Sequence, residues 1–188
     1  MPESDTYPGI SKTLKSGLAP IMTALGPFSV DFEPCGSVDL YTGLRRIAAR
    51  EGVSVDSLMP NIELARELKV DIVGNVRNVS TNICVQVICE VKKDDPLRLN
   101  HLAQLIGYCI ASKVPYGLLI GANSPPTAGF NNVLRGSPHL TEFVMNGVTQ
   151  HLSICDYNIE GERITVHSYG RLNSLTLLAR SIARKLQD

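Results

Sequence analysis

Hydrophobic residues follow two rhythms along this chain, one typical of helices and one typical of strands. A spacing of three to four residues predicts helices over residues 10–25, 38–50, 57–69, 97–112 and 172–186. Alternation with period two, or a short continuous apolar run, predicts strands over residues 28–32, 70–77, 83–92, 116–122, 152–157 and 163–169. Together these elements indicate an α/β fold with a central mixed β-sheet flanked by helices.

Turn-forming residues divide these elements. The short turn over residues 78–82 predicts that the strands on either side of it form an antiparallel pair. Residues 123–138 are rich in Asn, Ser, Pro and Gly, and they predict a mobile loop. Residues 139–146 predict a short helix, and Pro20 predicts an interruption in the first helix.

Length and charge narrow the classes of protein. The 188 residues are enough for one domain that buries about 70% of its unfolded surface, so folding requires neither a disulfide nor a metal. The 18 Lys and Arg residues balance 18 Asp and Glu residues. This neutrality excludes binding to nucleic acid or to a membrane through the overall field, and it leaves a local basic face as the route to a polyanion.

The cellular location is predicted from the N-terminus, the apolar segments and the cysteines. The first residues are polar and acidic, and they lack the basic start and apolar run of a signal peptide. The most apolar window, residues 102–122, contains Lys113 and Pro115, and we interpret it as a helix followed by a strand. Five cysteines form an odd set in apolar surroundings. We therefore expect a cytoplasmic protein with reduced thiols and no membrane partner.

The strand over residues 83–92 has one apolar face and one face that carries charge. Because strand side chains alternate, Val85, Val87 and Cys89 point into a core, whereas Glu90 and Lys92 project from the opposite face. The apolar character of this strand is almost continuous, which indicates burial on both faces.

Asp71 lies on the neighbouring predicted strand, where it can approach Glu90. Two adjacent carboxylates repel each other unless a cation lies between them. Mg²⁺ prefers a site of one or two carboxylates, a main-chain carbonyl and several waters. Such an ion polarises a phosphate and lowers the pKa of a bound water, and Lys92 could orient that water or stabilise the growing charge.

The helix over residues 97–112 carries a polar stripe. His101, Gln104 and Tyr108 share one face, where phosphate oxygens or the nearby lysine would serve as partners. Gln104 and Tyr108 could also simply bond to each other. We expect His101 at the surface, and Leu99 and Ala103 packed inward.

These motifs resemble the PD-(D/E)XK nuclease superfamily in order and in spacing. Asp71 lies on one strand, Glu90-Val91-Lys92 on the next, and Gln104-xxx-Tyr108 on the helix that follows, before a short apolar strand. The Gln-xxx-Tyr element is similar to that of RecB-type exonucleases. The resemblance covers about residues 63–122, a third of the chain.

The resemblance implies a restriction-endonuclease-like fold in a single domain over residues 1–188, with its core at about residues 57–122. It implies a nuclease that depends on Mg²⁺ or Mn²⁺ and hydrolyses phosphodiester bonds, most often in DNA. Asp71 and Glu90 would bind the metal together with the Val91 carbonyl, and Lys92 would be the catalytic base or electrostatic stabiliser.

The family also implies further site residues and a partner. Many members place a glutamate on the helix before the aspartate strand, and Glu63 is favoured here over Glu67. Substrate contacts are expected from Gln104, Tyr108 and Arg98. Lone domains of this size often act on both strands of a duplex as a two-fold homodimer.

Two other functions remain open. The chain could be a non-catalytic nucleic-acid-binding or assembly module with the same fold, which the low net charge favours. It could also be a small-molecule enzyme with a magnesium carboxylate site, which predicts a closed pocket. The arginines at 45, 46, 50, 180 and 184 are interpreted as solvated helix faces.

Overall fold

The computed structural model describes residues 2–59 and 62–187, and for residues 62 and 63 it describes the backbone alone. The α-helices are α1 (Tyr7–Leu25), α2 (Leu40–Glu51), α3 (Ile62–Ala65), α4 (Leu99–Ser112), α5 (Ala128–Gly136) and α6 (Leu175–Lys185). Three 3₁₀ turns accompany them: η1 (Glu3–Thr6), η2 (Val55–Ser57) and η3 (Pro138–Leu140). The strands are β1 (Phe28–Pro34), β2 (Ile72–Asn78), β3 (Cys84–Lys93), β4 (Tyr116–Ala122), β5 (Glu142–Met145), β6 (Val148–Asn158) and β7 (Arg163–Val166).

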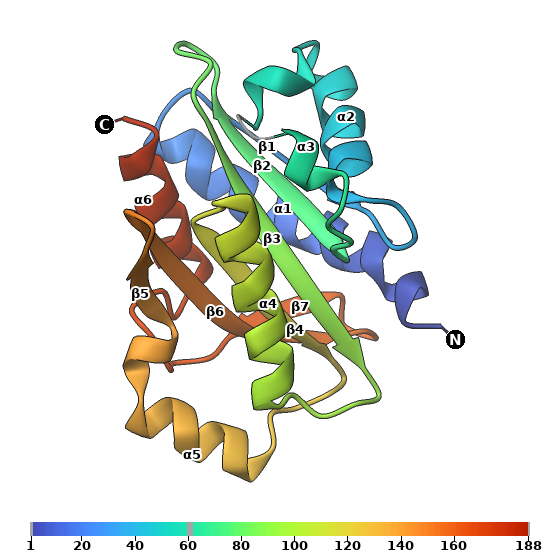
Figure 1. Cartoon of the computed structure of the whole chain (residues 1–188), viewed down its shortest axis with the longest axis vertical. Coiled ribbons are helices and arrows are strands. Elements are labelled where there is room, and N and C mark those ends of the chain that lie inside the picture. The colour runs from blue at the N-terminus through green and yellow to red at the C-terminus, as the bar shows by residue number, and fades with distance from the viewer. Residues whose placement is uncertain (1, 60–61, 188) are drawn as a thin grey trace.

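The seven strands found in the described residues form one mixed sheet in the order β1-β2-β3-β4-β6-β5, and β7 also pairs with β6 (Figure 1). β1, β2 and β3 are antiparallel neighbours. The β2–β3 pairing confirms the prediction made from the short turn between them. β3, β4 and β6 run parallel. β6 and β7 are antiparallel. The prediction of an α/β fold with a mixed sheet flanked by helices is therefore confirmed.

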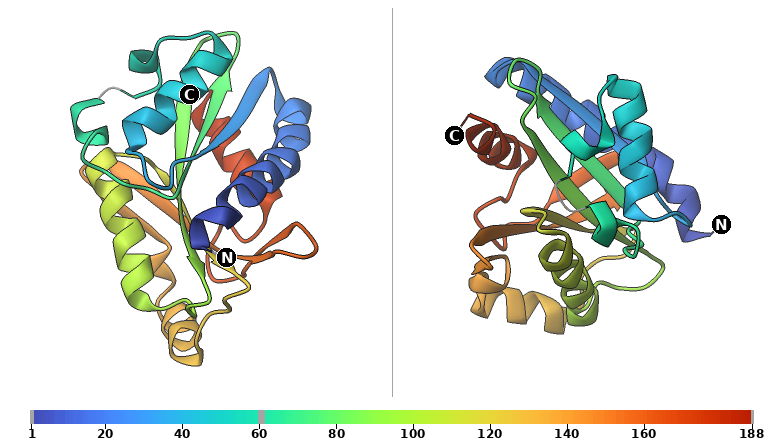
Figure 2. Two further views of the ribbon diagram at one scale, coloured as in Figure 1. Left: turned by 90° about the vertical axis from the view of Figure 1, so that its right-hand side faces the viewer. Right: turned by 45° about the horizontal axis from the view of Figure 1, so that its top comes forward.

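Helices cover both faces of the sheet (Figure 2). Each face has its own hydrophobic core. Ile10, Leu14 and Leu18 of α1 recur every four residues and pack with α6 against one face. α2 and α4 cover the other face with Leu44, Leu105 and their neighbours. β3 is buried on both sides, as predicted. Pro20 does not interrupt α1, which runs on to Leu25.

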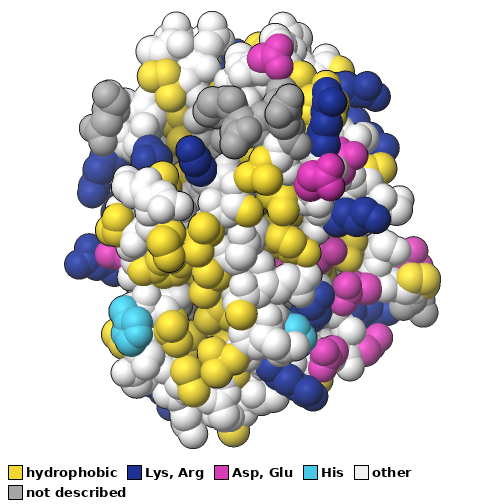
Figure 3. Space-filling view, viewed as in Figure 1, with side chains coloured by type: hydrophobic (Ala, Val, Ile, Leu, Met, Phe, Trp, Pro, Cys, Tyr) yellow, Lys and Arg dark blue, Asp and Glu magenta, His cyan; other side chains and the backbone are white. Residues whose placement is uncertain are grey.

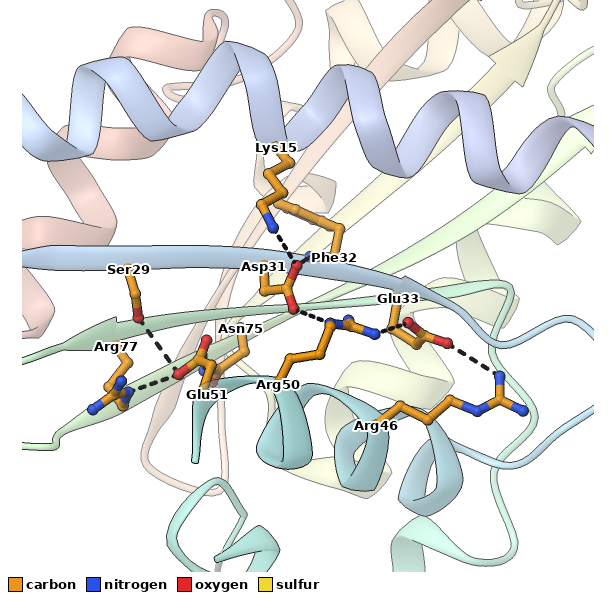
Figure 4. A network of polar contacts seen from close by, with 10 residues as sticks. All are labelled: Lys15, Ser29, Asp31, Phe32, Glu33, Arg46, Arg50, Glu51, Asn75 and Arg77. Carbon is orange, nitrogen blue, oxygen red and sulfur yellow. Dashed lines mark hydrogen bonds and ion pairs between the residues drawn. The ribbon is translucent and has the colours of Figure 1, made fainter. Parts of the chain in front are cut away.

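Ionic contacts hold α2 on the edge strand β1 (Figure 4). The Arg50 guanidinium lies 2.6 Å from both Asp31 Oδ2 and Glu33 Oε2. Lys15 of α1 and Arg46 of α2 bind the remaining oxygens of the same two carboxylates. Arg46 and Arg50 are therefore anchors of the fold as well as half-exposed cations, which corrects the interpretation of a purely solvated face.

The segment over residues 123–138 was predicted to be a mobile loop, and that prediction is wrong. It contains α5, whose N-terminus is capped because the Thr127 side chain accepts the Phe130 N–H at 3.2 Å. Phe130 and Leu134, four residues apart, are both buried. Burial of these two side chains outweighs the low helix propensity of the Gly and Asn residues around them.

The predicted helix over residues 139–146 is also wrong. η3 is followed by β5, which turns back into β6 through Asn146 and Gly147. Both turn residues have positive φ, 51° and 76°, as a two-residue hairpin of type I′ requires. The Asn-Gly pair therefore selects a hairpin where a helix was expected.

The helix predicted over residues 57–69 is reduced to one 3₁₀ turn and the four residues of α3. Residues 60 and 61, including the Pro60 expected in its first turn, lie outside the described residues. After α3 the chain runs toward β2, and the Leu68 carbonyl accepts the N–H of Leu40. In the described part of the chain, no helix is both long and apolar enough to cross a bilayer.

Candidate functional site

The antiparallel register of β2 and β3 places Asp71 across from Glu90. Val73 pairs with Ile88 and Ile72 with Cys89, so the residue just before β2 continues the ladder at Glu90. Residues that face each other across an antiparallel pair project from the same side of the sheet. Both carboxylates therefore lie on the face covered by α2 and α4, at the sheet end where β3 finishes.

Asp71 is held by two hydrogen bonds. Its Oδ2 accepts the Val91 N–H at 2.7 Å, and its Oδ1 accepts the Tyr7 hydroxyl at 2.7 Å. Burial raises the pKa of the Asp71 carboxyl, while both hydrogen bonds and the Lys92 charge act in the opposite direction. Asp71 is consequently fixed in orientation beside the Glu-x-Lys segment.

Glu90 and Lys92 form a close ion pair on the same face of β3. Lys92 Nζ lies 2.6 Å from Glu90 Oε1, and Glu90 is only 1% exposed. Burial, followed by repulsion from Asp71, raises the pKa of Glu90 to about 7, against the opposing effect of Lys92. Burial lowers the pKa of Lys92, but the bond and charge of Glu90 outweigh it and leave that pKa raised.

The N-terminus contributes two residues that the motifs did not indicate. Glu3 of η1 accepts the Lys93 N–H at 2.8 Å through Oε2, and its Oε1 lies 3.1 Å from the Tyr7 hydroxyl. Burial, followed by the neighbouring carboxylates, raises the pKa of Tyr7, so its hydroxyl stays protonated and donates. Glu3 brings a third carboxylate to the site. Because Glu3 lies more than 60 residues before Asp71 in the sequence, no local pattern predicts that the two are close.

Three expected substrate contacts lie apart from these residues. Gln104 Nε2 donates to the Tyr108 hydroxyl at 2.9 Å on the exposed side of α4, which matches the alternative that they bond to each other. Arg98 pairs with Asp95 at 3.6 Å. Among the described contacts, none joins Gln104, Tyr108 or Arg98 to the two carboxylates.

The glutamate expected on the helix before β2 is not placed. Glu63 lies in α3, but its side chain is outside the described residues. Glu67 is exposed, and no hydrogen bond or ion pair of its side chain occurs in the described part of the chain. Glu3 is therefore the further carboxylate that the described residues bring beside Asp71 and Glu90.

The faces of α4 differ from expectation at three positions. His101 is 5% exposed rather than at the surface, and its Nε2 lies 3.2 Å from Asp95 Oδ2. Leu99 is 44% exposed and Ala103 is exposed, although both were expected in the core. Figure 3 shows hydrophobic side chains gathered over α4. The stripe of α4 that faces the core is therefore rotated toward His101.

The carboxylates of Asp71, Glu90 and Glu3 are the ligand type that Mg²⁺ and Mn²⁺ prefer. Buried carboxylates that repel each other also favour a cation, as the raised pKa of Glu90 indicates. In the present arrangement Lys92 and Tyr7 occupy oxygens that an ion would need. The described residues also include no group of three or more acidic, His or Cys side chains spaced to hold a metal.

Comparison with known proteins gives no independent assignment of this site. No protein-family model matches the chain, and a search of curated proteins finds no significant match.

Proposed function

We propose that this protein is a divalent-cation-dependent nuclease of the PD-(D/E)XK type that hydrolyses phosphodiester bonds, with DNA as the expected substrate. The observation that carries the proposal is the meeting of Asp71, Glu90 and Lys92 at one end of β2 and β3. Asp71 Oδ2 accepts the Val91 N–H at 2.7 Å, and Lys92 Nζ lies 2.6 Å from Glu90 Oε1.

The order of elements supports a restriction-endonuclease-like fold. Asp71 immediately precedes β2, a hairpin leads to Glu90 and Lys92 on β3, and α4 connects β3 to the parallel strand β4. This is the succession of strand, strand, helix and strand that the family resemblance implies. We expect a two-fold homodimer where both strands of a duplex are cut.

The chemistry follows from the charges of the site. A divalent ion between Asp71 and Glu90, with Glu3 as a further oxygen ligand, would offset their repulsion and polarise the scissile phosphate. Its binding requires the Lys92 ammonium to move away from Glu90 and the Tyr7 hydroxyl to release Asp71. The freed ammonium would then stabilise the charge that develops on the phosphate oxygens.

The experiment is a cleavage assay on labelled single-stranded, duplex, flapped and branched DNA, and on RNA, with Mg²⁺ or Mn²⁺ and with EDTA. We expect metal-dependent cleavage by the wild type and at least a hundredfold loss in Lys92→Met and Glu90→Gln. Glu67→Gln is the matched control, because it removes an exposed carboxylate and should leave activity unchanged. If the wild type cuts none of the substrates, or if all three variants retain its activity, the proposal fails.

A non-catalytic nucleic-acid-binding module is the second candidate. The contacts Lys92–Glu90 and Tyr7–Asp71 favour it, because both occupy carboxylate oxygens. Such a module would bind nucleic acid equally well with and without a divalent ion. A filter-binding titration with Ca²⁺ or with EDTA distinguishes the two candidates, since the nuclease is expected to bind more tightly when the ion is present.

A further inference from the structure

A polar cavity lies beneath α6, on the side of the sheet opposite the candidate site. It has a volume of about 300 Å³, between α6, the β5–β6 hairpin and the segment before α6. Its polar lining consists of Glu142, His151, Arg171, Arg180, Ser181 and Arg184. The cavity therefore contains three guanidinium groups and one carboxylate.

Two of the arginines are available to bind a ligand. Arg180 and Arg184 lie one helical turn apart on α6, so their side chains project from the same face. Both are exposed, and neither has an ion-pair partner among the described residues. Like charges placed one turn apart destabilise a helix slightly, so an anion between them would be favourable.

The third arginine forms an ion pair with the carboxylate that lines the cavity. Arg171 Nη1 lies 3.3 Å from Glu142 Oε1, and His151 Nδ1 lies 3.3 Å from Glu142 Oε2. This single carboxylate offsets one of the three guanidinium charges, which leaves a net charge of about +2 with His151 neutral. A doubly charged anion matches that excess.

The Ser181 hydroxyl lines the cavity, and the buried Tyr116 hydroxyl behind it is its hydrogen-bond partner. The Tyr116 and Ser181 hydroxyls lie 3.0 Å apart and share one hydrogen bond. When Tyr116 donates this bond, the Ser181 proton is free for an acceptor in the cavity. The Tyr116 ring stacks on His151 with 5.4 Å between ring centroids, which holds the phenol in place. Arginine forks and hydroxyl donors together are the groups that recognise phosphate oxygens.

The cavity is separate from the candidate nuclease site. His151 pairs with Tyr116 at the beginning of β4, whereas Glu90 pairs with Leu119, three residues further along. Three residues along a strand and two strand spacings across the sheet amount to about 14 Å. Tyr116 also belongs to the core on the α1 and α6 face, opposite the face of Glu90.

We propose that this cavity binds a phosphate group through Arg180, Arg184 and the Ser181 hydroxyl, which its hydrogen bond to Tyr116 orients. The phosphate belongs either to the backbone of a nucleic acid or to a free phosphorylated molecule. The site does not depend on the proposed nuclease activity, because none of its residues takes part in that chemistry.

The test measures binding of two probes in EDTA. One is a fluorescently labelled single-stranded 20-mer followed by anisotropy, and the other is inorganic phosphate followed by calorimetry. In Arg180→Ser/Arg184→Ser we expect at least tenfold weaker binding of whichever probe the wild type binds. For the oligonucleotide, the slope of log affinity against log salt should fall by about 1.4, because two phosphate contacts are lost.

The matched control is Arg45→Ser/Arg163→Ser, which removes the same charge from two exposed arginines far from the cavity and should change affinity less than twofold. Glu142→Gln removes the one carboxylate that lines the cavity among the described residues, and it should tighten binding. Loss of oligonucleotide binding identifies a backbone phosphate, and loss of phosphate binding identifies a free ligand.

The proposal is overturned if the wild type binds neither probe, or if the two double variants weaken binding equally. Specific binding here by a protein that cleaves nothing would refute the nuclease proposal and leave this one intact. Metal-dependent cleavage by the wild type, together with unchanged affinities in Arg180→Ser/Arg184→Ser, would refute the phosphate site and leave the nuclease proposal intact.

Discussion

The raised pKa of Glu90 predicts that the stability of the protein depends on pH through this one carboxyl group. Burial and the Asp71 charge move the pKa from 4.5 to about 7 in the folded state, whereas the unfolded chain keeps the ordinary value. The folded protein therefore binds this proton more tightly than the unfolded chain does. Its contribution is fully present below about pH 4.5 and is lost as the pH rises toward 7.

The magnitude follows from the size of that change. Each pKa unit corresponds to 1.36 kcal/mol, so deprotonation of Glu90 costs the folded state roughly 3 kcal/mol by pH 8. Glu90 is 1% exposed, so solvent screens little of this cost. Against a typical total stability of about 5 to 15 kcal/mol, the effect is easily measured.

The perturbation is Glu90→Gln, which keeps the shape of the side chain and stays neutral at every pH. Lys92 lacks a carboxylate partner in this variant just as it does beside protonated Glu90, so the comparison is matched at low pH. The assay is urea unfolding followed by circular dichroism at pH 5, 6, 7 and 8 in EDTA. We expect the variant to be more stable than the wild type by about 1 kcal/mol at pH 5, and by roughly 3 kcal/mol at pH 8.

Divalent ions provide a second arm of the same experiment. Mg²⁺ bound at Glu90 would take the place of the proton, so millimolar Mg²⁺ should restore stability to the wild type at pH 8 and have little effect on Glu90→Gln. Parallel pH profiles for the two proteins in EDTA would refute the reasoning, because they would mean that Glu90 has an ordinary pKa.

Two further predictions concern other contacts. Arg50→Ala removes the two hydrogen bonds that a half-exposed guanidinium donates to buried carboxylates of β1, and it should lower the free energy of unfolding by about 2 kcal/mol. Arg45→Ala on the same helix should have no effect, and equal urea midpoints for the two variants would contradict this. Tyr7→Phe removes the hydroxyl that occupies Asp71 and should cost about 1 kcal/mol without metal, yet Mn²⁺ should raise its melting temperature more than that of the wild type. An equal rise in both proteins would show that Tyr7 does not compete with the ion.

The part of the fold that follows local patterns was predictable. Strand β4 has the predicted bounds, and the β2–β3 pair follows from a short turn between two alternating segments. Because the register of that pair is set by which face is buried, the approach of Asp71 to Glu90 followed as well. The ion pair of Glu90 with Lys92 likewise follows from their spacing on one strand.

The errors arose where tertiary contacts outweigh composition. α5 exists because Phe130 and Leu134 are buried, although the residues around them favour a loop. The Asn146-Gly147 pair is a local signal for the hairpin between β5 and β6, so this turn was predictable from the sequence. Glu3 and Tyr7 reach the site only through the packing of α1, which no spacing along the chain encodes.

The most direct test of the account is Mn²⁺ binding measured from the electron paramagnetic resonance signal of the free ion. The account predicts that the wild type binds the ion at a site that Asp71→Asn weakens at least tenfold and that the exposed-carboxylate control Glu67→Gln leaves unchanged. Binding of equal strength in the wild type and Asp71→Asn, or no binding by the wild type at all, would contradict it.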